Sequence, residues 1–263
     1  MNLLFIGDIV GRPGREAVRA CLPGLVQEYR VDLTIANAEN AAGGLGLTRV
    51  TAEELLSAGI DVLTTGNHVW KHRDFAEFAE VEPRIVRPAN YPPGTPGRPS
   101  CVYETDHSGP VGVLNLVGRT FMEPLDCPFR AADREIEALR GKTRVIVVDM
   151  HAEATSEKLA MRWYLDGRVS AVFGTHTHVQ TADEMTSPKG TAYITDVGMT
   201  GPRDSILGVR PEPVVRRFLT GMPTRFELAK GPVTLNAVVA DIDAETGRAR
   251  SVRRVIQFTG SEA

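Results

Sequence analysis

Two histidines stand one residue apart in the segment Gly174-Thr175-His176-Thr177-His178. An apolar run over residues 169–173 precedes them, so they directly follow a predicted buried strand. Because side chains on an extended backbone alternate faces, both imidazoles would address one side and could bind one metal ion or an adjacent pair. A solvated loop explains the pair equally well when it is taken alone. Its meaning therefore depends on whether other strand ends offer matching ligands.

Four other predicted strands also end in side chains that can bind metals. These side chains are Asp8 after residues 3–6, Glu39 and Asn40 after 33–36, Asn67 and His68 after 62–65, and His151 after 145–148. Each has an ordinary explanation as a helix cap, a turn residue or a half-buried histidine. Five such strand ends together would require five separate coincidences. In an open α/β fold, strand ends of this kind meet at one edge of the sheet, where ligands bind.

Helical segments predicted between the strands indicate an α/β fold, and we expect one domain over residues 1–263. The helices are expected at residues 11–26, 51–58, 133–140 and 158–165, and a C-terminal hairpin at 235–242 and 249–258. Seven prolines over residues 81–110 predict an irregular surface excursion. Residues 196–202 are predicted to form a turn-rich loop whose backbone amides could meet an anion.

Composition limits the function and the compartment. The net charge of -3 lacks the basic excess of proteins that hold nucleic acid through its phosphates, so small substrates fit better than duplexes. The three cysteines, Cys21, Cys101 and Cys127, are far apart and indicate neither a disulfide framework nor a thiolate zinc site. A run of about 18 apolar residues is also lacking. We therefore expect a soluble cytoplasmic protein without a membrane segment.

The combined donor set consists of carboxylate, amide oxygen and imidazole. Without thiolates, such a set suits iron, manganese or zinc better than calcium or copper(I). Seven or eight candidates are too many for one ion and indicate two metals, about 3.5 to 4 Å apart, that share a carboxylate bridge.

Two other motifs are weaker. Residues 11–14 match neither glycine-rich nucleotide-binding motif, and His72 lacks the zincin glutamate because Val69 follows His68, so we expect His72 at the surface.

At these strand ends the sequence resembles the calcineurin-like metallophosphoesterases, over residues 1 to about 200. The superfamily blocks appear here as Gly7-Asp8-Ile9-Val10, Ala38-Glu39-Asn40, Gly66-Asn67-His68, Met150-His151 and Gly174-Thr175-His176-Thr177-His178. Two positions depart from the usual pattern, since Val10 replaces a histidine and Glu39 replaces a bridging aspartate. With the stretches at 39–44, 151–158 and 195–201, this variant set resembles a bacterial YmdB-type branch, whose members are linked to 2',3'-cyclic nucleotide phosphodiesterase activity.

The resemblance implies a metallophosphoesterase-type sandwich of two central mixed β-sheets flanked by helices, with metals at the carboxyl ends of the strands. It implies that metal one is bound by Asp8, Glu39, Asn40 and His178, and metal two by Glu39, Asn67, His151 and His176. Glu39 would be the bridge, and iron or manganese is expected ahead of zinc. A metal-bound hydroxide would attack phosphorus while His68 protonates the leaving alkoxide. Asp149 would either orient a ligand histidine or remain a solvated carboxylate.

Two other classes of protein remain open. An amidohydrolase also uses H-x-H and two metals, but its pair belongs at the first strand, where this chain has Asp8. A non-catalytic or weakly catalytic regulatory protein that binds RNA or nucleotides could keep the same metal site for structure. For an enzyme, the expected partner is a small phosphodiester or a nucleotide. RNA binding and homo-oligomer formation stay open.

Overall fold

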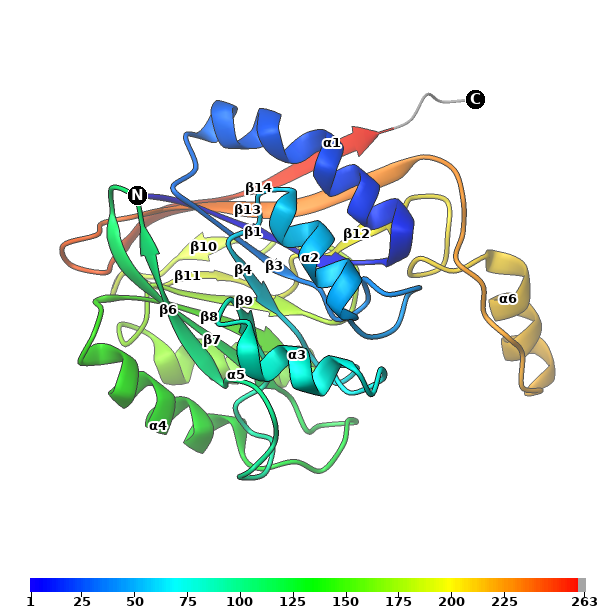
Figure 1. Cartoon of the computed structure of the whole chain (residues 1–263), viewed down its shortest axis with the longest axis horizontal. Coiled ribbons are helices and arrows are strands. Elements are labelled where there is room, and N and C mark those ends of the chain that lie inside the picture. Colours follow the sequence, from blue (N-terminus) through cyan, green and yellow to red (C-terminus); the bar gives the residue numbers. More distant parts are fainter. Residues whose placement is uncertain (260–263) are drawn as a thin grey trace.

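The computed structural model describes residues 1–259 as two β-sheets packed face to face, with helices on both outer faces (Figure 1). The first sheet has the order β2-β12-β13-β1-β3-β4-β5, with β14 beside β13, and the second has the order β10-β11-β9-β8-β7-β6. The predicted sandwich of two mixed sheets is confirmed.

The bounds of the elements are as follows. The first sheet consists of β1 (Asn2–Ile6), β2 (Asp8–Ile9), β3 (Leu33–Asn37), β4 (Val62–Thr64), β5 (Ile85–Val86), β12 (Met199–Pro202), β13 (Val233–Ile242) and β14 (Ala249–Thr259). The second sheet consists of β6 (Ser100–Thr105), β7 (Gly109–Val117), β8 (Val145–His151), β9 (Ala171–Thr175), β10 (Met185–Thr186) and β11 (Ala192–Ile194). The helices are α1 (Gly11–Tyr29), α2 (Arg49–Ser57), α3 (Phe75–Val81), α4 (Pro128–Arg140), α5 (Thr155–Leu165) and α6 (Pro211–Thr220).

An apolar interface lies between the two sheets. Phe5 of β1 meets Phe173 of β9 there, with ring centroids 5.4 Å apart. Helices α1, α2 and α3 cover the outer face of the first sheet, and α4 and α5 cover that of the second. Strands buried on both faces explain the continuous apolar runs in the sequence.

Parallel pairing brings the strand ends together. In the first sheet β3 pairs in parallel with both β1 and β4, and in the second sheet β8 pairs in parallel with both β7 and β9. Each set of strands therefore ends at one edge of its sheet. The two edges adjoin, since side chains that follow β1, β3, β8 and β9 are in contact.

Three sequence predictions differ from the structure. Residues 81–110 hold β5, β6 and the start of β7, and all of their prolines except Pro110 lie between elements, where no ladder donor is lost. The predicted loop at 196–202 contains β12, which pairs with β2 and β13. Helix α6 was not predicted, although Val214, Val215, Phe218 and Leu219 form an apolar stripe at helical spacing; in the structure Val214 is the one buried residue of the helix. Within residues 1–259, no helix is long and apolar enough to cross a bilayer.

Candidate metal centre

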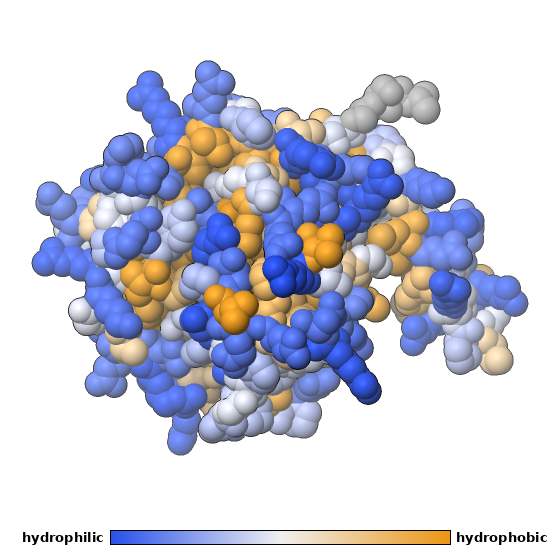
Figure 2. Space-filling model, viewed as in Figure 1, coloured by the Kyte–Doolittle hydropathy of each residue, from blue (hydrophilic) through white to orange (hydrophobic). Residues whose placement is uncertain are grey.

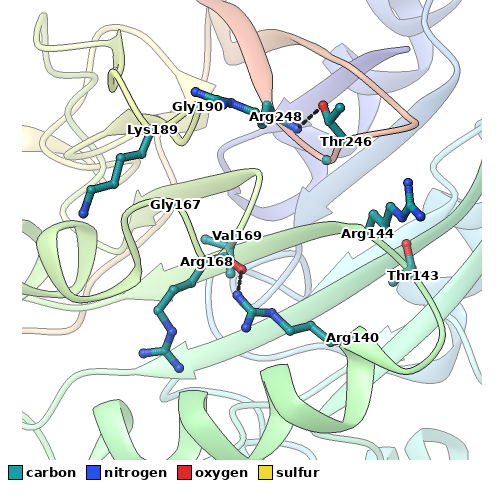
Figure 3. A pocket seen from close by; sticks show the side chains of 11 residues that line it. Arg140, Thr143, Arg144, Gly167, Arg168, Val169, Lys189, Gly190, Thr246 and Arg248 are labelled. Atoms are coloured by element: carbon teal, nitrogen blue, oxygen red, sulfur yellow. Dashed lines mark hydrogen bonds between the residues drawn. The ribbon is translucent and has the colours of Figure 1, made fainter.

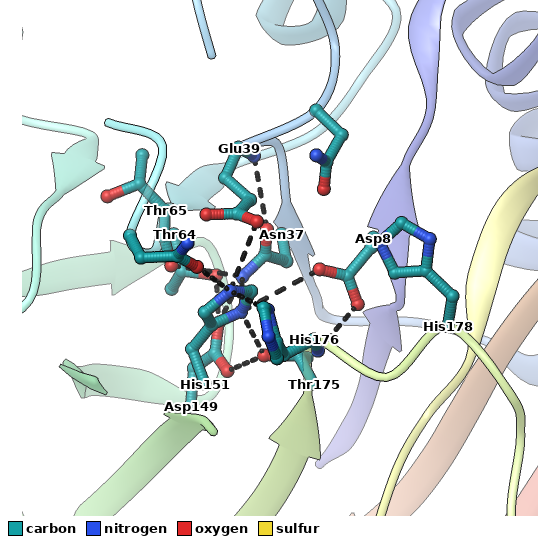
Figure 4. Close-up of polar contacts among 12 residues, drawn as sticks. Asp8, Asn37, Glu39, Thr64, Thr65, Asp149, His151, Thr175, His176 and His178 are labelled. Carbon is teal, nitrogen blue, oxygen red and sulfur yellow. Dashed lines mark hydrogen bonds and ion pairs between the residues drawn. The ribbon is translucent and has the colours of Figure 1, made fainter. Parts of the chain in front are cut away.

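The structure brings the predicted ligands together where the strands end (Figure 4). Asp8, Glu39 and His151 are almost completely buried, and they come from three strand ends in two sheets. Full burial of three ionisable side chains at one point is costly unless they are paired or bind a metal. The arrangement is therefore that of a binding centre rather than of a solvated rim.

His151 Nε2 is the centre of one group of donors. It lies 3.1 Å from Glu39 Oε1, 3.1 Å from Asn67 Oδ1 and 3.0 Å from His176 Nδ1. Donor atoms of Glu39, His151 and His176 all lie within 4.8 Å of one another. Gly66 makes room for this group, because a Cβ there would approach Glu39 Oε2 and His151 Cδ2 to 2.4 Å. This set fits one metal ion.

Asp8 and Asn40 supply a second group of donors beside the first. Asp8 Oδ1 and Asn40 Oδ1 are buried and accept no hydrogen bond within residues 1–259. Asn40 Nδ2 donates to the Gly44 carbonyl over 3.0 Å, which commits the amide nitrogen and leaves its oxygen free. Unsatisfied buried oxygens cost about 1 to 3 kcal/mol each. A cation bound by these oxygens would remove that cost, so their chemistry fits metal binding.

The H-x-H segment is not extended, and this premise of the sequence prediction is wrong. The φ angles of His176 and His178 are 96° and 68°, a region that non-glycine residues seldom occupy. The backbone N–H of His176 donates to Asp8 Oδ2 over 3.1 Å, which stabilises this conformation. The two imidazoles consequently point to different partners, that of His176 towards His151 and that of His178 towards Asp8 (Figure 4). One histidine therefore lies beside each group of donors.

Electrostatics favours the metal-binding protonation states of Glu39 and His176 but not that of His151. Burial alone would lower the pKa of His151, but the charge of Glu39 and its hydrogen bond, with the charges of Asp8 and Asp149, raise that pKa to about 9, so a metal ion must displace a proton there. Burial alone would raise the pKa of Glu39, but the charges and hydrogen bonds of His151 and His68 together lower that pKa to about 2. Burial, with the charge of His151, lowers the pKa of His176 to about 3. At neutral pH Glu39 is thus ionised and the His176 imidazole is neutral, the forms that coordinate metals.

Asp149 is completely buried and supports His151 indirectly. The carboxylate accepts hydrogen bonds from Thr64 Oγ1 (2.6 Å), Asn37 Nδ2 (2.9 Å) and Thr175 Oγ1 (2.7 Å), and Thr175 Oγ1 lies 2.8 Å from His151 Nδ1. Burial raises the pKa of Asp149 to about 6. The alternative of a solvated strand-end carboxylate is wrong.

A buried ion pair, which sequence analysis missed, fixes the H-x-H segment. Lys158 Nζ lies 2.7 Å from Asp196 Oδ2, and both side chains are excluded from solvent. Asp196 also accepts hydrogen bonds from the Thr177 backbone N–H (3.0 Å) and hydroxyl (2.6 Å) and from the Gly198 backbone N–H (2.8 Å). Lys158 ends the stretch at residues 151–158 on which the family resemblance partly rests, and this position was the sequence signal for a role of the lysine.

With this geometry established, comparison with known proteins identifies the family. The model of the YmdB-like protein family matches residues 4–255. The chain belongs to the YmdB-like family. It is 51% identical over 256 residues to a 2',3'-cyclic-nucleotide 2'-phosphodiesterase of Bacillus subtilis (strain 168), covering 97% of each chain.

Two solved structures share the fold of this YmdB-like protein at high similarity. A hypothetical protein from Thermus thermophilus has a TM-score of 0.91 at 46% identity, with 98% of this chain and 99% of that chain covered. A protein described as a novel phosphatase of Mycoplasma pneumoniae has a TM-score of 0.92 at 36% identity, with 98% and 93% covered. The similarity therefore extends over almost the whole chain.

Two further histidines lie near the centre. His68 is half-buried, and its backbone N–H donates to Glu39 Oε2 over 3.0 Å. Burial lowers the pKa of His68, although the charge of Glu39 acts in the opposite direction. The ring of His72 lies outside the donor groups, with Nε2 3.0 Å from the Leu45 carbonyl oxygen. His72 is half-buried against Leu45 and Gly46 and is not the exposed residue that the sequence predicted.

Two surface cavities differ sharply in chemistry. A cavity of about 630 Å³ is lined by His68 and by residues of both donor groups, Glu39, Asn40, His176 and His178. Another, of about 380 Å³, lies before the amino ends of β8 and β9 and is bordered by Arg140, Arg144, Arg168, Lys189 and Arg248 (Figure 3). The lining of this second cavity contains no histidine or carboxylate. The candidate metal ligands therefore border the first cavity and not the second.

Proposed function

We propose that this YmdB-like protein is a metal-dependent phosphodiesterase that hydrolyses small phosphodiesters, with 2',3'-cyclic nucleotides as substrates. The observation that carries the proposal is that, in the part of the chain that the structure describes, two buried oxygens, Asp8 Oδ1 and Asn40 Oδ1, lack a hydrogen bond beside the cluster of Glu39, His151 and His176. Two adjacent donor groups of oxygen and imidazole suit a binuclear centre. The name of the Bacillus subtilis relative supports the substrate class.

In this proposal metal one is held by Asp8, Glu39, Asn40 and His178, and metal two by Glu39, Asn67, His151 and His176. Iron or manganese is proposed ahead of zinc, because the donors are oxygen and imidazole without sulfur. When bound, two such ions neutralise phosphoryl charge and make water acidic enough to supply a nucleophile at neutral pH. Glu39 is the proposed bridge, because its carboxylate touches His151 and lies in the same cavity as Asn40 and His178.

His68 is the proposed proton donor to the leaving alkoxide. It lines the cavity, it follows the ligand Asn67, and its backbone is tied to Glu39, so its position is fixed by the centre itself. Its low pKa opposes this role, because only an imidazolium can donate. The negative charge of a bound phosphodiester raises the pKa of a neighbouring imidazole and acts in favour of the protonated form.

A regulatory protein with a structural metal site is the competing hypothesis, and turnover separates the two. Metal-loaded protein should hydrolyse bis(p-nitrophenyl) phosphate, and it should hydrolyse 2',3'-cyclic nucleotides faster than nucleoside monoesters. Glu39→Gln serves as the control for contaminating hydrolases, because it removes the proposed bridging charge. Absence of hydrolysis above this control, with both metals bound, would favour the regulatory protein. A preference for monoesters would remove the phosphodiesterase assignment.

A further inference from the structure

Helix α6 belongs to an arm that stands off from the sandwich. The arm consists of residues 211–226, and Figure 1 shows it at the side of the molecule, away from the other helices. Its base is a short paired segment, in which the Arg210 N–H donates to the Glu227 carbonyl (2.9 Å) and the Ala229 N–H donates to the Gly208 carbonyl (3.0 Å). Figure 2 shows a notch between the arm and the body on this face.

The base of the arm is locked to the loop that carries Asn40. The Leu228 side chain occupies the space that a Cβ would take at Gly11 and Gly44, with approaches of 2.3 Å and 3.0 Å. Both glycines have positive φ, so a side chain there would be strained as well as blocked. The arm consequently holds a fixed position relative to the metal centre.

The inner side of the arm forms the wall of the cavity that faces the metal ligands. Val214, Phe218 and Phe226 line this wall together with Arg217. Phe218 is 85% exposed and Phe226 is 41% exposed, which leaves two aromatic faces open to a ligand. The Arg217 guanidinium lies 5.4 Å from the centroid of the Phe226 ring, and within residues 1–259 it makes no ion pair with a carboxylate.

The cavity therefore has a metal-binding wall and an aromatic wall, a polarity that matches a nucleotide. We propose that Phe218 and Phe226 form a nucleobase subsite, with the phosphodiester at the metal centre and the ribose between. This proposal rests on the proposed function, which it extends to substrate recognition. Aromatic side chains stack on any base, and Arg217 can add a cation–π contact. The cavity lining next to these aromatic rings is apolar and includes Leu207 and Val209. The subsite should therefore bind different nucleobases with similar affinity.

The outer side of the same helix supplies a matched control. Val215 and Leu219 border a separate groove on the other side of α6, and Leu219 is 81% exposed. Leu219→Ala therefore changes an exposed apolar residue of the arm without changing the cavity wall. A general disturbance of the arm would affect this variant as much as Phe226→Ala.

The test compares ligands with and without a base on the metal-loaded protein. Binding of adenosine 3'-monophosphate and ribose 3-phosphate is measured by calorimetry, and turnover of 2',3'-cyclic AMP is compared with that of the 1-O-methyl ribose 2',3'-cyclic phosphate. Phe226→Ala and Phe218→Ala should each lower the affinity for the base-containing ligand by roughly 5- to 150-fold, which corresponds to the loss of one stacking contact. KM should rise in parallel while kcat is retained, since the base lies away from the reacting atoms.

The outcomes separate this proposal from the proposed function. Base-dependent binding that is lost in Phe226→Ala and kept in Leu219→Ala supports the subsite, even if turnover of every diester were absent and the proposed function failed. Equal affinity of wild type for the two ligands overturns the subsite, even where both cyclic diesters are hydrolysed. An equal loss of affinity for both ligands in Phe226→Ala overturns the subsite as well.

Discussion

Removal of the Lys158 charge should destabilise the protein strongly, although this lysine is no proposed ligand. Lys158→Met keeps much of the side-chain volume but leaves the Asp196 carboxylate buried without its counter-ion. Three hydrogen bonds from Thr177 and Gly198 remain, so the carboxylate keeps these donors and loses the opposite charge together with the hydrogen bond from Lys158 Nζ. Breaking one partner of a buried pair costs about 3 to 5 kcal/mol.

For a chain of this size, that loss corresponds to a fall in Tm of roughly 6 to 10 °C, at about 2 °C per kcal/mol. Thermal unfolding would be followed by circular dichroism at saturating metal, so that weakened metal binding does not add to the shift. Lys158→Met/Asp196→Asn should recover part of the loss, because the buried charge is then gone.

Lys189→Met is the matched control. The Lys189 side chain is 69% exposed, and its Nζ lies 3.9 Å from Asp166, so its removal should change the free energy of unfolding by less than about 1 kcal/mol. If Lys158→Met shifted Tm no more than Lys189→Met, the buried pair would have no special role and our account of how the H-x-H segment is held would be wrong.

Three further predictions concern the centre. Glu39→Ala should lose both metals, whereas Asn40→Ala should weaken mainly metal one. Elemental analysis after dialysis checks this, and two retained ions in Glu39→Ala would remove the bridge assignment. Thr175→Val should lower metal affinity by about 10- to 100-fold through the lost support of His151, measured by competition with a chelator; unchanged affinity would make the Asp149 network purely structural. His68→Ala should keep both metals yet lose roughly 10²- to 10⁴-fold in rate on a cyclic nucleotide. It should lose much less on a nitrophenyl diester, whose leaving group departs without a proton, and equal losses would exclude the proton-donor role.

Sequence reasoning could place the donors at the strand ends because buried parallel strands leave a local signature. Short runs rich in Val, Ile and Leu followed by polar residues identified the ends of β1, β3, β4, β8 and β9 without knowledge of the pairing. The meeting of these ends then needed only the tendency of open α/β sheets to collect their carboxyl ends at one edge, whereas the order of the strands was not predicted.

Features set by tertiary contacts could not be predicted in this way. The positive φ of His176 depends on its hydrogen bond to Asp8, which is 168 residues away in the sequence. Strand β12 has only four residues and forms by pairing with distant β2 and β13. Helix α6 has an apolar stripe at helical spacing, but most of that stripe is exposed, so its position off the sandwich could not be predicted from periodicity.

The most direct test of the account is anomalous X-ray diffraction from crystals of protein purified without chelator and resupplied with manganese or iron. Our account predicts two anomalous peaks. One should be coordinated by Asp8 and Asn40 and the other by His151 and His176, with Glu39 touching both. A single peak, or none, in crystals that retain the folded strand ends would contradict the binuclear centre.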